Sequence, residues 1–340
     1  MLYSFIENTL KTDINFKKLI LFNYFLWNSK LVGTYKDFLI KHLDSGETKA
    51  VLYIGTKVLE KFTRILVKKG FYWLLPIITS KLTDPLRSNI NENDIPEFLE
   101  VTIYGEKATL TRSLIIHKRI LVSSGYEKIF FLSPCIRLEV LEKLKTNRHS
   151  YEFTQLDFEI AYGKYKDVFK LVEEMLIETL KYVKKDVKEL LDTEIRIPKK
   201  PFKIYDREDL EKDFGKNWEE KISIEIKDPV WVTNIPRQFY DLEIDGKWIN
   251  YDLILPEGYG EVLSGGEREY EYEKILKKME RSGLNPENYR LLLDLAKEGL
   301  LKPSAGAGIG IERFVRWVTR RKTIYEVQPF PRIIGKIFEL

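Results

Sequence analysis

The chain has 340 residues, 44% of them hydrophobic, and its 56 basic and 52 acidic residues leave a net charge of only +4. This composition predicts a folded protein with a sizeable core, and no block is basic enough to require a nucleic-acid partner. A single cysteine, Cys135, excludes an internal disulfide and a cysteine-rich zinc site. Because no apolar run approaches the roughly 20 residues of a membrane span, we expect a cytoplasmic protein without a membrane partner.

The first half of the chain passes from helical to strand patterns. Residues 1–50 carry helical patterns without a motif, and residues 50–70 place apolar side chains at spacings of three and four before Gly70, which predicts an amphipathic helix. FYWLLPIIT, interrupted by Pro76, is typical of a buried strand. Short β-rich runs follow from 98 to 162, and the last two, KIFFLSPCIRLEV and SYEFTQLDFEIAYG, predict an antiparallel pair with a long loop.

The second half begins with an amphipathic helix over residues 164–192, and the charged, proline-flanked region within 186–228 is typical of a surface connection or a small insertion. Three strand-like runs follow, with a turn at Asp245 and Gly246. Helices over about 269–281 and 286–299 precede GAGIGIERF, in which every second residue from Gly306 is a glycine. These elements predict an α+β fold, a mostly antiparallel sheet flanked by helices, with 51–340 as one domain after a helical extension over 1–50.

Four charged clusters fall on the predicted strands. A lone cluster fits a solvent-facing sheet surface, and the glycine run alone fits a turn before a helix. Taken together, the clusters offer arginines that grip phosphate, carboxylates that hold Mg²⁺ through oxygen, and a glycine strand open to a flat base. The sequence therefore predicts an ATP site formed by Arg137 and Glu139; Gln155, Asp157 and Glu159; Asp252, Glu261, Ser264 and Arg268; and Arg313.

The ordered motifs GFYWLLPIITSKLTDP, IFFLSPCIRLE, RHSYEFTQLDFE and GAGIGIERF resemble those of class II aminoacyl-tRNA synthetases, particularly the aspartyl and asparaginyl members. The similarity runs from about residue 55 to 335. It implies that Pro76 lies at a homodimer interface and that the glycine strand forms the floor under adenine. The proposed ATP-binding residues are Arg137, Glu139, Arg148, His149, Glu261, Gly308, Gly310 and Arg313, with Arg137 and Arg313 as the catalytic arginines.

The same resemblance assigns the metal and the amino acid. Asp252, Glu261 and Ser264 match Mg²⁺ ligands, although PEGYG makes the intervening loop longer than usual. RSLIIHK stands where aspartyl enzymes carry a QSPQxxK-like segment, so that Lys118 is retained and Arg112 is new. We expect the amino acid to be bound by Arg112, Lys118, Gln155, Asp157 and Arg268. Two cations favour aspartate over asparagine, because a neutral amide would leave them under-compensated.

Aspartyl- and asparaginyl-tRNA synthetases carry an N-terminal anticodon-binding domain of about 100 residues, and about 50 residues precede the catalytic pattern here. Together with SGGEREYEYE and KPSAGAGIGIERFVR, this resembles the archaeal asparagine synthetases related to those enzymes. The implied reaction joins aspartate, ATP and ammonia into asparagine, AMP and diphosphate, with tRNA an unlikely partner. The alternatives are a truncated synthetase that acylates tRNA or another carrier, and a non-catalytic regulatory paralogue.

Overall fold

The computed structural model describes residues 35–81, 84 and 99–337. Helix α3, Tyr35–Asp44, belongs to one compact unit and residues Ala50–Ile337 form the other. Most of the predicted extension over 1–50 lies outside the described residues. Within the described part of the chain, no helix combines the length and the apolar character that crossing a membrane requires.

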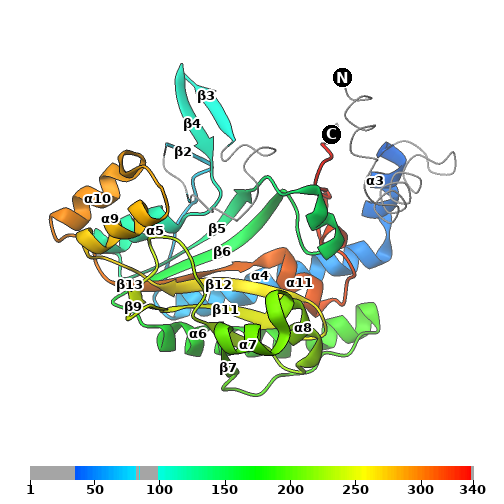
Figure 1. Ribbon diagram of the computed structural model, residues 1–340. Helices are drawn as coiled ribbons and strands as arrows, with labels where there is room; N and C mark the ends of the chain where they lie inside the picture. The colour runs from blue at the N-terminus through cyan, green and yellow to red at the C-terminus, as the bar shows by residue number, and fades with distance from the viewer. Residues whose placement is uncertain (1–34, 82–83, 85–98, 338–340) are drawn as a thin grey trace, which may run out of the picture. The chain divides into compact units, whose positions relative to one another are not determined.

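An eight-stranded sheet is the centre of the larger unit (Figure 1). Its outer pairs, β1 with β5 and β7 with β8, are parallel, and every other pair is antiparallel, as the sequence patterns predict for most of the sheet. In spatial order the strands are β1 (Tyr72–Trp73), β5 (Lys128–Ile136), β6 (Glu152–Ala161), β13 (Ser304–Gly310), β12 (Gly260–Glu267), β11 (Asn250–Leu255), β8 (Val230–Thr233) and β7 (Lys203–Asp206).

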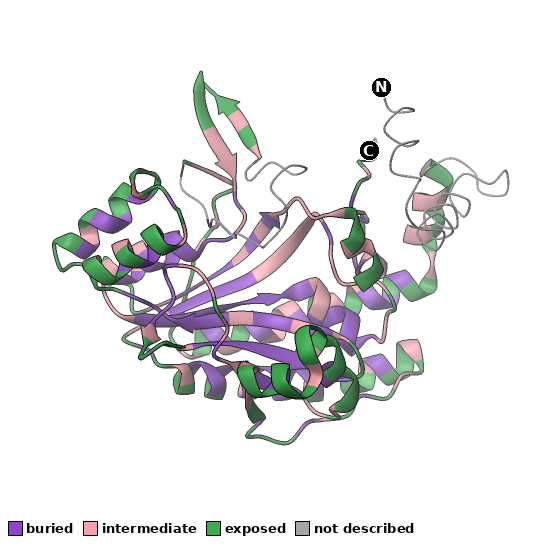
Figure 2. Cartoon of the chain, viewed as in Figure 1, coloured by how far each residue is buried: buried purple, intermediate pink, exposed green. Residues whose placement is uncertain are grey.

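Three helices cover one face of this sheet: α4 (Gly46–Lys68), α6 (Tyr165–Leu191) and α11 (Ile311–Val318). The apolar side chains of α6 recur at helical spacing and are buried against the sheet, which is why the pattern over 164–192 predicts this helix correctly. On β6, Leu156 and Phe158 join that core. Successive side chains of a strand point to opposite faces, so Gln155, Asp157 and Glu159 are directed to the other face of the sheet. Figure 2 shows that the long strands of this sheet are largely buried, whereas many residues of the surrounding helices are exposed.

A second group of helices packs around its own apolar cluster beside that other face. This group comprises α5 (Ile115–Ser123), α9 (Tyr272–Arg281), the 3₁₀ turn η3 (Pro286–Tyr289) and α10 (Arg290–Lys297). Lys118 lies on α5. The smaller elements are the sheet of β2 (Thr79–Ser80), β4 (Glu106–Leu110) and β3 (Glu100–Ile103), the hairpin of β9 (Glu243–Ile244) and β10 (Lys247–Trp248), and the 3₁₀ turns η1 (Leu141–Thr146) and η4 (Ile324–Val327).

The region over 186–228 is folded onto the main sheet. After the end of α6 it adds strand β7 and continues through α7 (Arg207–Phe214), the 3₁₀ turn η2 (Gly215–Asn217) and α8 (Trp218–Glu225). Leu210 and Ile222 of these helices are buried against Val230, Val232 and Ile254 of β8 and β11. The segment therefore belongs to the architecture of the larger unit and brings side chains to its site.

The apolar run FYWLLPIIT differs from its sequence-based prediction. Its strand, β1, has only two residues, and Tyr72, Trp73 and Leu75 are exposed, Leu75 by 88%. As the edge strand of the sheet, β1 has neighbouring side chains on one side only, so fewer apolar groups are available to cover its own. The prediction of a buried strand is therefore wrong for this chain taken alone.

Candidate active site

The glycines of β13 face the polar side chains of β6. In the sheet register, Gly306 lies opposite Glu159, Gly308 opposite Asp157 and Gly310 opposite Gln155. A side chain at Gly308 would place its Cβ 3.0 Å from the Asp157 Oδ1 and 3.1 Å from the Gln155 Nε2. The glycine run, taken together with the charged clusters, predicts a strand open to a flat ligand. The structure adds a second reason, because the polar side chains of the neighbouring strand lean across these glycines.

Lys118 is almost fully buried and paired within the protein. Its ammonium lies 3.0 Å from the Asp157 Oδ1 and 3.5 Å from the Glu159 Oε2, and it donates to the Phe158 carbonyl oxygen at 3.2 Å. The second oxygen of Asp157, Oδ2, is buried and accepts no hydrogen bond from the described residues. An unpaired buried carboxylate oxygen is costly unless a donor reaches it. Asp157 is thus equipped to accept a hydrogen bond from a ligand.

Arg268 is buried beside the same carboxylates. Its Nε lies 3.1 Å from the Glu159 Oε1, and its Nη1 lies 2.6 Å from the Asp241 Oδ1. Burial alone would lower the pKa of Arg268, but Glu159 and Asp241 raise it above its usual value. Lys118 and Arg268 therefore already have carboxylate partners. A neutral substrate would not leave these two cations without compensating charge, so their presence does not by itself favour aspartate over asparagine.

These residues line a polar cavity of about 320 Å³. Its charged lining is balanced: the carboxylates are Asp84, Asp157, Asp241 and Glu261, and the cations are Lys118, Arg137, Arg237 and Arg268. Asp84 is buried and accepts hydrogen bonds from the Tyr240 hydroxyl at 3.1 Å through both oxygens. A zwitterion of small size fits such a lining better than an apolar ligand does.

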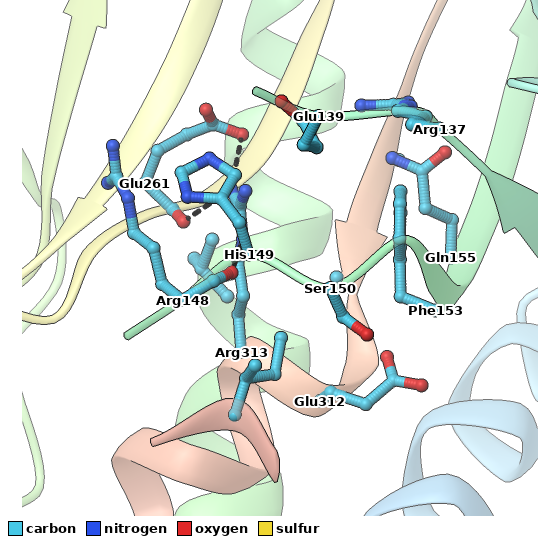
Figure 3. A pocket seen from close by; sticks show the side chains of 14 residues that line it. Arg137, Glu139, Arg148, His149, Ser150, Phe153, Gln155, Glu261, Glu312 and Arg313 are labelled. Atoms are coloured by element: carbon cyan, nitrogen blue, oxygen red, sulfur yellow. Dashed lines mark hydrogen bonds and ion pairs between the residues drawn. The ribbon is translucent and has the colours of Figure 1, made fainter. Parts of the chain in front are cut away.

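A second cavity adjoins the first and carries the residues of the predicted ATP site (Figure 3). Arg313 crosses it: its Nη1 lies 3.1 Å from the Glu261 Oε1 and donates to the Glu261 carbonyl oxygen at 3.0 Å. The aliphatic part of the Arg313 side chain lies next to Gly310. With Arg313 in this position the cavity volume is only about 30 Å³, so a nucleotide would require Arg313 to move away from Glu261.

Arg137 lines both cavities. Its Nε donates to the carbonyl oxygen of Arg112 at 3.1 Å, and its guanidinium stands 5.0 Å from the centroid of the Phe153 ring. This stacking holds the planar group while leaving its edge available for phosphate. Phe153 is not among the site residues predicted from the sequence, although it lies two residues before Gln155 on β6 and therefore on the same face.

His149 and Arg148 stand at the other side of the nucleotide cavity. Burial, and after it the charges of Arg313 and Arg148, lower the pKa of His149 far below its usual range. A histidine in this position is neutral near pH 7, so that it offers a phosphate an N–H donor rather than a positive charge. Arg148 forms an ion pair with Glu219 of α8, a partner that no sequence motif indicates.

The predicted metal ligands lie on neighbouring strands, with Asp252 of β11 opposite Ser264 of β12. Burial raises the pKa of Asp252 to about 7; Arg237 opposes this shift and Glu261 adds to it. Arg237 contacts both Asp252 and Ser264, while Arg313 holds Glu261. The described residues contain no group of three or more His, Cys, Asp and Glu side chains suited to a metal. Two carboxylates and a hydroxyl fit Mg²⁺, which keeps waters and substrate phosphates as further ligands. To bind the ion, these groups would have to exchange their contacts with Arg237 and Arg313 for the metal.

Most of the predicted site residues come together around the two cavities, but three do not: Arg112, Asp252 and Glu159. Arg112 contributes its backbone carbonyl to Arg137, and Asp252 lies behind Arg237. Glu159 is buried in ion pairs with Lys118 and Arg268. The nucleotide cavity is lined by Arg137, Glu139, Arg148, His149, Glu261, Gly308, Gly310 and Arg313. The amino-acid cavity is lined by Lys118, Gln155, Asp157, Ser264 and Arg268, together with Arg237 and Asp241, which the sequence motifs did not indicate.

Comparison with known proteins agrees with this geometry. The family model of class II tRNA synthetases (D, K and N) matches residues 35–334. The asparagine–tRNA ligase of Thermococcus kodakarensis is 28% identical over 323 residues, covering 87% of this chain and 72% of the relative. That of Pyrococcus abyssi is 28% identical over 327 residues, covering 89% and 72%.

The solved asparaginyl-tRNA synthetase of Pyrococcus horikoshii, complexed with asparaginyl-adenylate, superposes with a TM-score of 0.76 at 25% identity. The match covers 90% of this chain and 74% of that one. Fold, motif order and sequence therefore agree, and the chain belongs to the class II tRNA synthetase family of the D, K and N type.

Proposed function

We propose that the chain is an ammonia-dependent asparagine synthetase that forms AMP. A β-carboxylate oxygen of aspartate attacks the α-phosphorus of ATP, and diphosphate leaves. Ammonia then attacks the acyl carbon of β-aspartyl-AMP and loses a proton. AMP departs and keeps the β-carboxylate oxygen that attacked the phosphorus. The products are asparagine, AMP and diphosphate, so the enzyme would be an AMP-forming aspartate–ammonia ligase.

One observation carries the adenylation step: Arg137 lines both cavities. A phosphate held by Arg137 would lie where the nucleotide cavity meets the amino-acid cavity. A carboxylate bound in the second cavity then faces that phosphate without a change of site. Positioning of this kind, together with charge neutralisation by the arginines, is a sufficient basis for adenylate formation.

For the nucleotide, Phe153 and the stem of Arg313 offer faces for the adenine ring and Glu139 offers an acceptor for its amino group. Arg148 and the neutral His149 lie where the outer phosphates would extend. Mg²⁺, held by Glu261 with Asp252 and Ser264, would neutralise phosphate charge. These assignments rest on the cavity lining and on the resemblance of the motifs.

For aspartate, the free Oδ2 of Asp157 supports binding of the ammonium group. Lys118 and Arg268 line the same cavity and would attract a carboxylate through their charge, because the Lys118 ammonium already donates to Asp157, Phe158 and Ala307. Because the β-carboxylate must approach the α-phosphorus, these cations would meet the α-carboxylate instead. Gln155 would complete the contacts, and Arg112 would act from outside the cavity unless its side chain turns inward.

A second candidate is supported by the relatives. Those described above are named asparagine–tRNA ligases, and the internal pairing of Lys118 and Arg268 suits a neutral amide as well as a carboxylate. In that case the α-carboxylate of the amino acid is activated as an adenylate, and the aminoacyl group is then transferred to tRNA. A non-catalytic paralogue is disfavoured, since Arg137, Arg313 and Glu261 are all in place.

The test separates these reactions by their products. Radiolabelled aspartate is incubated with ATP and Mg²⁺, with ammonium in one reaction and tRNA in a second, and radiolabelled asparagine with tRNA in a third. We expect labelled asparagine newly formed from aspartate, with stoichiometric AMP, in the first reaction, and no labelled tRNA in the second or the third. Arg137→Ala should abolish both products of the first reaction, whereas the exposed Arg64→Ala should leave them unchanged. Labelled aminoacyl-tRNA in the second or third reaction, with no asparagine formed in the first, would contradict the proposal.

A further inference from the structure

Helix α8 is fastened to the turn between β11 and β12 by one buried residue, Ser223. The Ser223 hydroxyl donates to the Leu255 carbonyl oxygen at 2.7 Å and accepts the Gly260 N–H at 2.9 Å. The Ser223 carbonyl oxygen accepts the Gly258 N–H at 3.0 Å. These three hydrogen bonds fix the height and rotation of α8 above the strand that carries Glu261.

Glu219 precedes Ser223 by four residues and therefore lies on the same side of α8. Its Oε1 accepts the Glu261 backbone N–H at 3.2 Å and pairs with the Arg148 guanidinium. The side chains of Arg148 and Glu219 are 18% and 29% exposed, so this ion pair is partly shielded from water. Burial lowers the pKa of Arg148, but Glu219, and after it Glu261 and Asp252, oppose this effect, so that the pKa is raised overall.

Gly260 provides the space that this ion pair occupies. Its φ is +74°, and a Cβ at Gly260 would lie 2.0 Å from the Arg148 Nη1 and 3.3 Å from the Glu219 Oε1. A larger residue would displace the guanidinium from the rim of the nucleotide cavity. The contacts of Ser223, Glu219 and Gly260 thus converge on the position of Arg148.

We infer that Glu219 is a positioning residue for nucleotide binding, which holds Arg148 in place for the outer phosphates of ATP. The inference rests on the proposed function, because it takes Arg148 as the phosphate partner. It also gives the α7–α8 segment a role: this segment supplies a carboxylate that orients a cation of the ATP site.

Binding of ATP and of AMP to the full chain, measured by calorimetry with Mg²⁺ and without amino acid, tests this inference. AMP lacks the outer phosphates, so a loss of positioning should weaken ATP alone. We expect Glu219→Ala to weaken ATP binding about tenfold, the scale of one charge-assisted hydrogen bond, and to leave AMP binding unchanged. Glu219→Gln, whose amide oxygen still accepts both hydrogen bonds, should restore most of the affinity.

Arg148→Ala should reproduce the effect, and the double variant should lose little more than either single variant. Glu220→Ala, an acidic residue next to Glu219 on α8, serves as the matched control. The inference is overturned if Glu219→Ala binds ATP as the unmodified chain does or more tightly, or if ATP and AMP weaken equally. An unmodified chain that binds neither nucleotide would instead overturn the proposed function.

Discussion

Gly306 and Gly310 lie on one strand but differ in what surrounds them. A Cβ at Gly306 would lie 2.1 Å from the Glu159 Oε2 and 2.2 Å from the Phe158 carbonyl oxygen. At Gly310 the nearest contact would be the flexible Arg313 side chain at 3.4 Å. The sequence shows the same residue at both places, and only the neighbouring strand distinguishes them.

We therefore expect Gly306→Ala to destabilise the fold by about 3 kcal/mol or more, since backbone and a buried carboxylate would have to move. Gly310→Ala should cost roughly 1 kcal/mol or less, because its neighbour can shift. Urea unfolding of the two variants gives the comparison. Equal losses of unfolding free energy would show that cross-strand crowding is not the reason for these glycines.

Glu312 gives the fold a dependence on pH. Burial raises the pKa of Glu312 to about 7 from the usual 4.5, although the Thr154 N–H, which donates to the carboxylate, opposes the shift. The folded chain then retains a proton that the unfolded chain releases. The free energy of unfolding should fall by up to about 3 kcal/mol as the pH rises from about 4.5 to about 7.

Glu312→Gln removes this titration while keeping an oxygen that accepts the Thr154 N–H. Urea unfolding at several pH values without nucleotide should show a flatter profile for the variant across this interval. It should also be more stable than the unmodified chain above pH 7. A variant with the original slope would mean that another group accounts for the pH dependence.

At the scale of elements, Glu173 joins α6 to the polypeptide that enters β7. One carboxylate oxygen, Oε1, accepts the Phe202 N–H and the Trp231 indole N–H, each at 3.0 Å. Both residues are buried. Glu173 therefore satisfies two donors that lie far from each other in the sequence.

Glu173→Ala should leave both donors unpaired and lower the unfolding free energy by about 2–5 kcal/mol, whereas Glu173→Gln should cost less because its amide oxygen still accepts. Glu174→Ala is the matched control, since Glu174 lies next to it and forms only a partly exposed pair with Lys69. Thermal or denaturant unfolding measures all three. Similar losses for the Ala variants would contradict this account.

Elements with a strong local signal are those that the sequence predicts well. The periodicity of α6, the alternation in β5 and β6, and the Asp245–Gly246 turn between β9 and β10 are all confirmed. The elements β7, α7 and α8 are short and charged, and they owe their places to a shared apolar cluster with β8 and β11. Their pairing is a tertiary property that local patterns do not encode.

The site follows the same division. Motif order and period two predict that Arg137, Gln155, Asp157 and Arg313 lie near one another, and these residues line the two adjoining cavities. Asp241 meets Arg268 through an isolated bridge outside the named strands, and Glu219 reaches Arg148 across more than 70 residues. Neither partner has a local pattern that signals charge pairing, so only the folded chain reveals it.

For the whole molecule, the exposed apolar residues in and after β1 indicate a surface that another chain covers. Tyr72, Trp73, Leu75, Ile77 and Ile78 are all exposed within 71–79, next to the end of α4. Several exposed large apolar side chains in one short segment are typical of a subunit interface. Together with the family resemblance of the Pro76 segment, they support the proposal of a homodimer.

Light scattering at micromolar concentration should therefore give the mass of a dimer. Leu75→Lys should shift it toward the monomer, because a charge would be buried at the interface without a partner. Ile204→Lys, on the exposed side of β7, is the control and should leave the mass unchanged. A monomeric unmodified chain would count against the interface.

In the proposed reaction, the β-carboxylate of aspartate becomes bonded to the α-phosphorus of ATP at the junction of the two cavities. Aspartate labelled with oxygen-18 in its β-carboxylate tests this directly, with mass spectrometry of the AMP formed in the presence of ammonium. We expect one labelled oxygen in each AMP, since the carboxylate oxygen bonded to phosphorus stays there when ammonia displaces AMP. Unlabelled AMP from this substrate, with labelled AMP from aspartate that carries oxygen-18 in its α-carboxylate instead, would contradict the proposed reaction.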